Sequence, residues 1–167
     1  DGLSPDLEAH RARINRSAKA LMITPTVETA DMVEMVREGL KSYPKDAAVY
    51  IRPMYWALAG DELGIVPLKD ATGFAISLEQ IPMAAPDAAT TLTRTRFRRP
   101  VLEDNVVNAK AGCLYPNNAR MMVEARAKGF GNALVADAMG NVAESASANV
   151  FMVKDGEVFT PIPNGTF

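Results

Sequence analysis

Two short stretches decide the fold and chemistry of this chain: Asn108–Tyr115, with the sequence NAKAGCLY, and Glu144–Phe151, with the sequence ESASANVF. The first stretch supplies an amine at Lys110 and a phenol at Tyr115, and the second supplies a carboxylate at Glu144. Small residues flank the lysine and leave space for a flat ring to approach it. Together the two stretches predict a site built from an amine, a phenol and a carboxylate.

These three groups are the ones needed to hold and use pyridoxal phosphate. A lysine amine can form a Schiff base with the cofactor aldehyde and can then move a proton as a general acid and base. A carboxylate against the pyridine nitrogen keeps that nitrogen protonated, and a phenol can hydrogen-bond the ring oxygen. We therefore predict that Lys110 is catalytic and that Lys110, Tyr115 and Glu144 bind the cofactor.

Each of these assignments has a plainer alternative. Lysines and glutamates are mostly exposed, so Lys110 can be a surface lysine at a strand end and Glu144 a surface loop acid. Tyr115 can be a half-buried tyrosine that packs beside the following helix. The residue types and their spacing do not decide between the cofactor-binding roles and these plainer ones.

The bulk properties favour a globular protein. The 167 residues are 48% hydrophobic and 23% charged, and the net charge is -2. This charge predicts no general attraction to nucleic acid or to anionic membranes. A single cysteine excludes an intramolecular disulfide, and with a single histidine it argues against a zinc site, so we expect no bound metal. We see no membrane span or secretory signal and expect a cytoplasmic protein.

Hydrophobic periodicity and turn residues predict alternating helices and strands. Ser4 is expected to cap the first helix, with Pro5 in its first turn, and Asp155–Gly156 is expected to turn a hairpin. The predicted helices span 4–21, 28–40 and 119–128, and the predicted strands span 49–52, 74–78, 91–96, 133–136, 148–153 and 157–160. This order indicates a mixed α/β chain in two parts.

Arginines supply candidates for binding anions. Arg13, on the first predicted helix, has the planar fork that suits a phosphate. Arg52, on the first predicted strand, can pair with a substrate carboxylate, although an exposed strand arginine is the plainer interpretation. Arg11 and Arg16 are interpreted as solvated helix positions.

A second group of arginines flanks Phe97. Clustered cations with an aromatic residue are one feature of nucleic-acid-binding proteins, but the overall charge does not support that function. We interpret the cluster as the solvated face of a strand; its members are Arg94, Arg96, Arg98 and Arg99.

The stretch Asn108–Gly112, followed by Tyr115, resembles the segment around the Schiff-base lysine of the branched-chain amino acid aminotransferases, which are fold-type IV enzymes. The stretch Asn141–Phe159, with Glu144, is similar to the segment that carries the pyridine-nitrogen carboxylate in that family. The resemblance raises Lys110 from one lysine among many to the expected catalytic residue.

Two further segments resemble the same family in the same order along the chain. The helix that contains His10 and Arg13 is similar to the one whose arginine binds the cofactor phosphate. The stretch Tyr50–Pro53 resembles the strand whose tyrosine and arginine face the substrate, which makes Tyr50 and Arg52 the expected substrate-binding residues.

The resemblance implies a fold-type IV architecture with a small N-terminal α+β domain and a larger C-terminal domain, both incomplete in this chain. It places part of the small domain at 1–80, an interdomain loop at 81–90 and the first part of the cofactor-binding domain at 91–167. The chain has no initiator methionine and stops at a turn, which indicates an internal segment of a longer protein. Family members are usually homodimers, and we expect one here.

The activity implied is pyridoxal phosphate-dependent transamination of branched-chain or related L-amino acids, with 2-oxoglutarate as the acceptor. The expected partners are therefore small amino acids and 2-oxo acids. The alternatives are a D-amino acid or amine transaminase, an aminodeoxychorismate lyase, or a non-catalytic homologue that binds the cofactor. Tyr115 favours the branched-chain group, because the other groups usually carry a different residue at that place.

Overall fold

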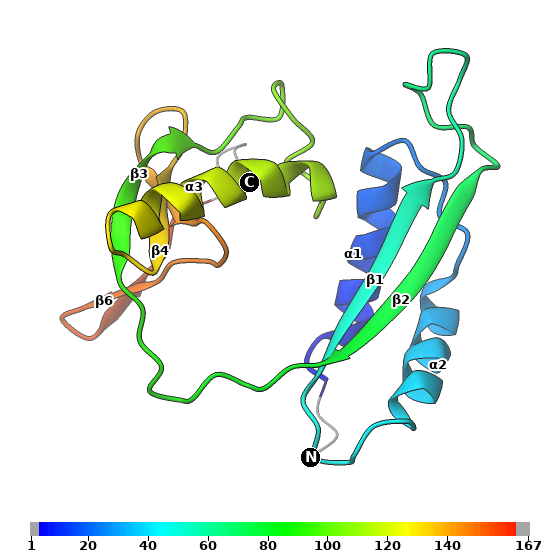
Figure 1. Cartoon of the computed structure of the whole chain (residues 1–167), viewed down its shortest axis with the longest axis horizontal. Coiled ribbons are helices and arrows are strands. Elements are labelled where there is room, and N and C mark those ends of the chain that lie inside the picture. The colour runs from blue at the N-terminus through cyan, green and yellow to red at the C-terminus, as the bar shows by residue number, and fades with distance from the viewer. Residues whose placement is uncertain (1–3, 163–167) are drawn as a thin grey trace. The chain divides into compact units, whose positions relative to one another are not determined.

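The computed structural model describes residues 4–162 and divides the chain into two compact units, Asp1–Pro86 and Asp87–Phe167 (Figure 1). Each unit combines helices with strands, which confirms the predicted mixed α/β class. Among the described residues, no helix combines the length and the apolar character that crossing a bilayer requires.

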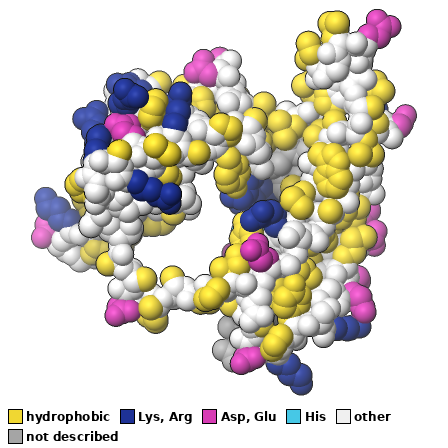
Figure 2. Space-filling model, in the orientation of Figure 1, with side chains coloured by type: hydrophobic (Ala, Val, Ile, Leu, Met, Phe, Trp, Pro, Cys, Tyr) yellow, Lys and Arg dark blue, Asp and Glu magenta, His cyan; other side chains and the backbone are white. Residues whose placement is uncertain are grey.

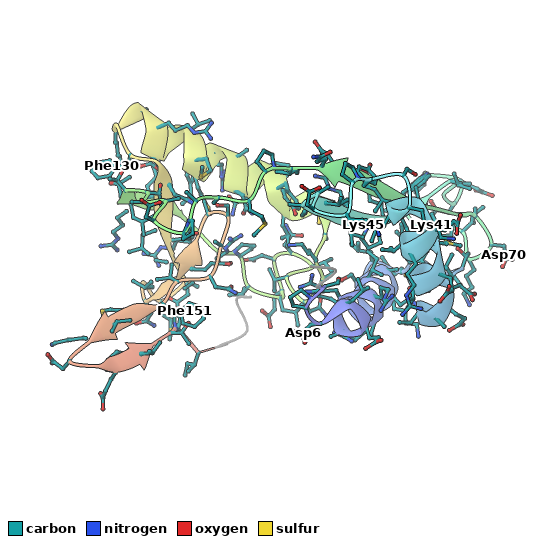
Figure 3. The ribbon with its side chains drawn as sticks, turned by 90° about the horizontal axis from the view of Figure 1, so that it is seen from below. Asp6, Lys41, Lys45, Asp70, Phe130 and Phe151 are labelled. Carbon is teal, nitrogen blue, oxygen red and sulfur yellow. The ribbon has the colours of Figure 1, made fainter. Side chains whose placement is uncertain are left out.

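The first unit is an antiparallel hairpin with two helices on one of its faces (Figure 3). Its elements are α1 (Leu7–Ala20), α2 (Thr29–Leu40), β1 (Val49–Ala57) and β2 (Thr72–Gln80). On α2, Met32 and Val36 lie one helical turn apart and are both buried. The other face of the hairpin is open and carries hydrophobic side chains such as Trp56, which is 43% exposed (Figure 2).

The start of α1 differs from the prediction. Asp6, and not Ser4, is the N-cap residue, and it makes no side-chain capping hydrogen bond. The Asp6 backbone lies in the left-handed region at φ 50°, a conformation that aspartate tolerates better than most residues. That conformation interrupts the helix, so Pro5 lies in a turn before it.

Strand β1 is longer than predicted, because it continues through Pro53, which lies opposite Ile76 of β2. Proline cannot donate to a ladder and is therefore confined to edge positions. In a two-stranded sheet both strands are edges, so the pairing continues on both sides of this residue.

The second unit contains a parallel crossover followed by two antiparallel pairings. Its elements are β3 (Leu92–Arg98), the 3₁₀ helix η1 (Gly112–Leu114), α3 (Tyr115–Ala127), β4 (Asn132–Ala136), β5 (Val142–Ser145), β6 (Met152–Lys154) and β7 (Glu157–Phe159). Strand β4 pairs in parallel with β3 and antiparallel with β5, while β6 and β7 form a separate hairpin. Parallel strands need a crossover connection, which α3 provides.

The predicted hairpin turn is confirmed. Asp155 and Gly156 have φ values of 53° and 82°, the two positive values that a tight hairpin turn of this kind requires. Other elements differ from the predictions: α3 begins at Tyr115 and not at Ala119, β6 begins at Met152 and not at Ala148, and β5 was not predicted. The strand β5 buries an alanine and a serine and exposes its valine, so no hydrophobic alternation marks it in the sequence.

The core of the second unit lies where α3 covers β3 and β4. Its fully buried members are small or flexible, and two larger side chains pack against them; the cluster consists of Met121, Ala125, Ala133, Val135 and Ala146, with Phe97 and Met122 at its border. Three alanines allow the helix to approach the sheet closely, so this core depends on tight packing.

Shortening Met121 to alanine tests this core. Met121 is fully buried, so Met121→Ala should lower the free energy of unfolding by about 2–5 kcal/mol through lost burial and a cavity. The matched control is Val123→Ala on the same helix, because Val123 is 66% exposed and its shortening should cost less than about 0.5 kcal/mol. Denaturant titration measures both, and equal losses would contradict the assignment of the core.

Candidate functional site

Lys110 lies in the loop between β3 and η1. Its neighbours Ala109 and Ala111 are buried, at 7% and 2% exposure, whereas the lysine side chain is exposed. The two alanines therefore anchor the backbone of the loop, while the lysine side chain remains accessible to solvent. The small residues beside Lys110 therefore hold the loop in place as well as leaving space around the lysine.

Glu144 lies on β5 opposite Val135 of β4, and its side chain is 17% exposed. Partial burial raises the pKa of the Glu144 carboxyl, and the charges of Arg99 and Lys110 lower it again in part. The lysine is therefore within electrostatic reach of the carboxylate. The fold brings Lys110 and Glu144 into one neighbourhood although they are distant in sequence.

Arg99 is the centre of this neighbourhood. Its Nε atom lies 2.5 Å from Oε1 of Glu144, its Nη1 donates to Oδ1 of Asn118 at 2.6 Å, and its Nη2 donates to the carbonyl of Ser145 at 3.3 Å. The Nε contact is an ion pair and not a directed hydrogen bond, because the two atoms are close but the N–H does not point at the oxygen. The arginine thus links the end of β3 to α3 and β5.

The interpretation of Arg99 as part of a solvated strand face is wrong. Its side chain is 9% exposed, whereas Arg94, Arg96 and Arg98 are exposed. Strand alternation carries the signal that could have separated them, because side chains two residues apart share a face. Arg99 follows the inward positions Thr95 and Phe97.

Tyr115 is the first residue of α3 and is 54% exposed. Within residues 4–162 its hydroxyl makes no hydrogen bond to another residue. The short helix η1 separates it from the lysine loop. Its predicted role toward a cofactor ring oxygen stays a prediction.

The arginines of α1 are placed differently from the prediction in one respect. Arg13 and Arg16 are exposed, but Arg11, interpreted as solvated, is only 3% exposed. Within the described residues its Nε and Nη1 atoms have no hydrogen-bond partner. Burial lowers the pKa of the Arg11 guanidinium, Glu8 raises it, and Arg37 lowers it further. Seven residues are nearly two helical turns, so the buried Ala18 marks the same face.

Tyr50 and Arg52 lie together on one face of β1. Both are exposed, and the Arg52 Cζ atom lies 5.1 Å from the centre of the Tyr50 ring. The opposite face of the strand carries Tyr55, whose hydroxyl accepts a hydrogen bond from the Val27 backbone N–H at 3.1 Å. The predicted substrate pair is therefore on the face that α1 and α2 leave open.

The candidate residues divide between the two units. Lys110, Tyr115 and Glu144 belong to the second unit, and Arg13 and the pair on β1 belong to the first. The second unit by itself holds the amine, the carboxylate and the arginine that accompanies the carboxylate. It can therefore position a proton-transferring amine near an anionic group.

Comparison with known families gives this arrangement its context. The model of the family "Amino-transferase class IV" matches residues 1–167, and the chain belongs to that family. It is 31% identical over 158 residues to a probable branched-chain-amino-acid aminotransferase of Rickettsia typhi, covering 93% of this chain and 54% of that protein. A putative branched-chain-amino-acid aminotransferase of Methanocaldococcus jannaschii is 32% identical over 165 residues, covering 96% and 55%.

Solved structures give the same result. An aminotransferase from Brucella abortus, whose crystal structure contains PLP, is 59% identical, with a TM-score of 0.96 over all of this chain and 59% of that one. A branched-chain aminotransferase from Thermoproteus uzoniensis, solved with norvaline, is 27% identical, with a TM-score of 0.79 over 93% and 52%. The resemblance and the fold-type IV architecture are thereby confirmed, and the chain spans about half the length of the curated relatives it matches.

Removing the Arg99 charge tests the ion pair. Arg99→Gln leaves Glu144 partly buried without its nearest cation, so it should lower the free energy of unfolding by about 2–4 kcal/mol at neutral pH. Arg126→Gln, an exposed change on α3, should change it by less than about 0.5 kcal/mol. Adding Glu144→Gln to Arg99→Gln should recover part of the loss. Equal stability of the two single variants in denaturant titration would contradict this role of Arg99.

The raised pKa of Glu144 predicts a pH dependence. The folded state holds a proton on the Glu144 carboxyl more readily than the unfolded state does, where the pKa of this carboxyl has its ordinary value of 4.5. Its stabilising contribution is therefore complete below that value and is lost as pH rises through the higher folded pKa. Relative to Glu144→Gln, the wild-type protein should lose stability as pH rises above 4.5, at no more than about 1.4 kcal/mol per pH unit. A constant difference, or a relative gain, would refute the assignment.

Proposed function

We propose that this chain carries the catalytic lysine of a pyridoxal phosphate-dependent aminotransferase that acts on branched-chain or related L-amino acids, with 2-oxoglutarate as the acceptor. The observation that carries the proposal is that Lys110 lies within electrostatic reach of Glu144, whose carboxylate forms an ion pair with Arg99. The names of the relatives support the donor class. The acceptor follows from the family resemblance.

The residues fit the cofactor by their chemistry. PLP, when bound, supplies an aldehyde carbon for an amine and a pyridine ring that accepts electrons. Lys110 offers an exposed amine, and Glu144 offers a carboxylate that is only partly open to solvent. An amine and a carboxylate within electrostatic reach of each other match the two ends of such a ring.

Lys110 has two roles in the proposal. Its Nζ atom holds the cofactor at the aldehyde carbon, and after release it moves a proton between the substrate α-carbon and the cofactor. Both roles require the side chain to be accessible, and the buried alanines beside it leave it so while fixing its backbone.

Glu144 holds a proton on the pyridine nitrogen, which requires the carboxylate to remain ionised. Burial works against ionisation, and the charge of Arg99 works for it. Arg99 is therefore a positioning residue, because it acts through the Glu144 carboxylate. Hydrogen bonds to Asn118 and to the Ser145 carbonyl hold the Arg99 guanidinium in place.

The remaining assignments come from the resemblance. Tyr115 is assigned to the ring oxygen, Arg13 to the cofactor phosphate, and Tyr50 with Arg52 to the substrate. The proposed domain division is 1–80 and 91–167, joined by the loop 81–90. A homodimer in the cytoplasm is the proposed setting of the whole protein.

The lysine assignment is tested on the full-length protein. Lys110→Ala should abolish transamination, because no other group replaces the amine at the reacting carbon, whereas Lys154→Ala in the exposed β6–β7 hairpin should retain it. Borohydride reduction of the wild-type holoenzyme, followed by peptide mass mapping, should place a pyridoxyl group on Lys110. Retained turnover in Lys110→Ala, or a pyridoxyl group only on another lysine, would refute the assignment.

The donor class is tested separately. We expect faster turnover with L-Leu than with D-Ala or with aminodeoxychorismate. Preference for D-Ala or for aminodeoxychorismate would replace the branched-chain assignment with one of the alternatives in the same fold. Cofactor binding without turnover of any of the three would support a non-catalytic homologue.

A further inference from the structure

A groove of about 350 Å³ lies between β3 and α3 in the second unit, apart from the residues proposed for catalysis. Four cationic side chains and a single carboxylate line it; its lining consists of Arg94, Thr95, Arg96, Arg98, Glu124, Lys128 and Ala136. Figure 2 shows Lys and Arg side chains gathered over this part of the molecule. The groove concentrates positive charge in a chain whose net charge is -2.

An irregularity in the sheet forms the wall of the groove. Arg94 lies opposite Leu134 and Arg98 opposite Ala136. Strand β3 therefore advances four residues over the length in which β4 advances two. The extra residues leave the regular ladder, and such bulges redirect side chains. This is why neighbouring residues of β3 line one groove.

Glu124 and Lys128 of α3 hold the bulge in place. Oε2 of Glu124 accepts from the Thr95 hydroxyl at 2.6 Å and from the Arg96 backbone N–H at 3.2 Å. Lys128 Nζ donates to Oε1 of Glu124 at 2.7 Å and to the Arg94 carbonyl at 3.1 Å. Hydrogen bonds from Lys128 and Thr95 are the main causes that lower the pKa of Glu124 to about 2. Both carboxylate oxygens of Glu124 are thus hydrogen-bonded to residues that line the groove.

The charges of Arg94 and Arg96 are not engaged in this way. Within residues 4–162 neither guanidinium forms an ion pair or donates a hydrogen bond, although that of Arg96 lies 4.9 Å from the centre of the Phe97 ring. Arg98 differs, because it donates to the carbonyls of Asp137 and Ala138. Two forked donors therefore face a preformed groove without an acceptor.

We propose that this groove binds a small molecule that carries several linked phosphates. Guanidinium forks match phosphate oxygens in pairs, and the volume is in the range of small-ligand sites. A single exposed ion pair contributes little, so a ligand must engage both free arginines at once. The short groove and the acidic chain disfavour nucleic acid, whose binding depends on many phosphate contacts.

The experiment uses the full-length enzyme saturated with PLP, so that added phosphates do not report on the cofactor site. Calorimetric titration with inorganic triphosphate should give saturable binding that weakens as salt is raised. The variant Arg94→Gln/Arg96→Gln should bind at least tenfold more weakly with transamination retained. The control Arg126→Gln removes an exposed arginine of α3 outside the groove and should bind as the wild type does.

Two comparisons decide the ligand class. Triphosphate binding tighter than citrate binding supports recognition of phosphate, whereas equal binding would overturn it in favour of a general anion surface. Tighter binding of a single-stranded oligonucleotide than of triphosphate would also overturn the proposal. Unchanged triphosphate binding in the double variant, or no binding to the wild type, would overturn it as well. Binding is measured directly, so these results do not depend on the donor assignment.

Discussion

The contact between Arg99 and Glu144 connects the parts of the second unit on which its chemistry depends. Arg99 follows the end of β3, Glu144 lies on β5, and Asn118 of α3 holds the guanidinium from a third side. A partly buried carboxylate is costly unless a cation accompanies it. The pairing therefore ties the end of β3 to β5 across the intervening β4, and it holds the carboxylate within electrostatic reach of Lys110.

Strand β3 separates two kinds of positive charge. Arg99, which follows it on the inward side, compensates a carboxylate, while Arg94 and Arg96 on the outward side remain available to a ligand. The same residue type thus serves structure and recognition within a few positions. The difference lies in the partners: one guanidinium is surrounded by acceptors, and the others face an open groove.

The first unit shows the same principle on a helix. Arg11 and Arg13 are two residues apart on α1, and side chains so spaced point to nearly opposite sides. Arg11 is buried, and Arg13 is exposed. A buried arginine with unpartnered nitrogens is unusual, and composition gave no reason to prefer one arginine to the other.

The sequence by itself determined the α/β class, the positions of most helices and strands, the Asp155–Gly156 turn and the family, because these follow from local periodicity, turn chemistry and short motifs. Tertiary structure alone decided which charged groups distant in sequence meet, as Arg99 and Glu144 do. Burial and pairing of Arg99 depend on β5, a strand without hydrophobic alternation in the sequence, and on a helix that begins before its apolar pattern does. Electrostatic interactions between such groups depend on distance in space, which local patterns do not record.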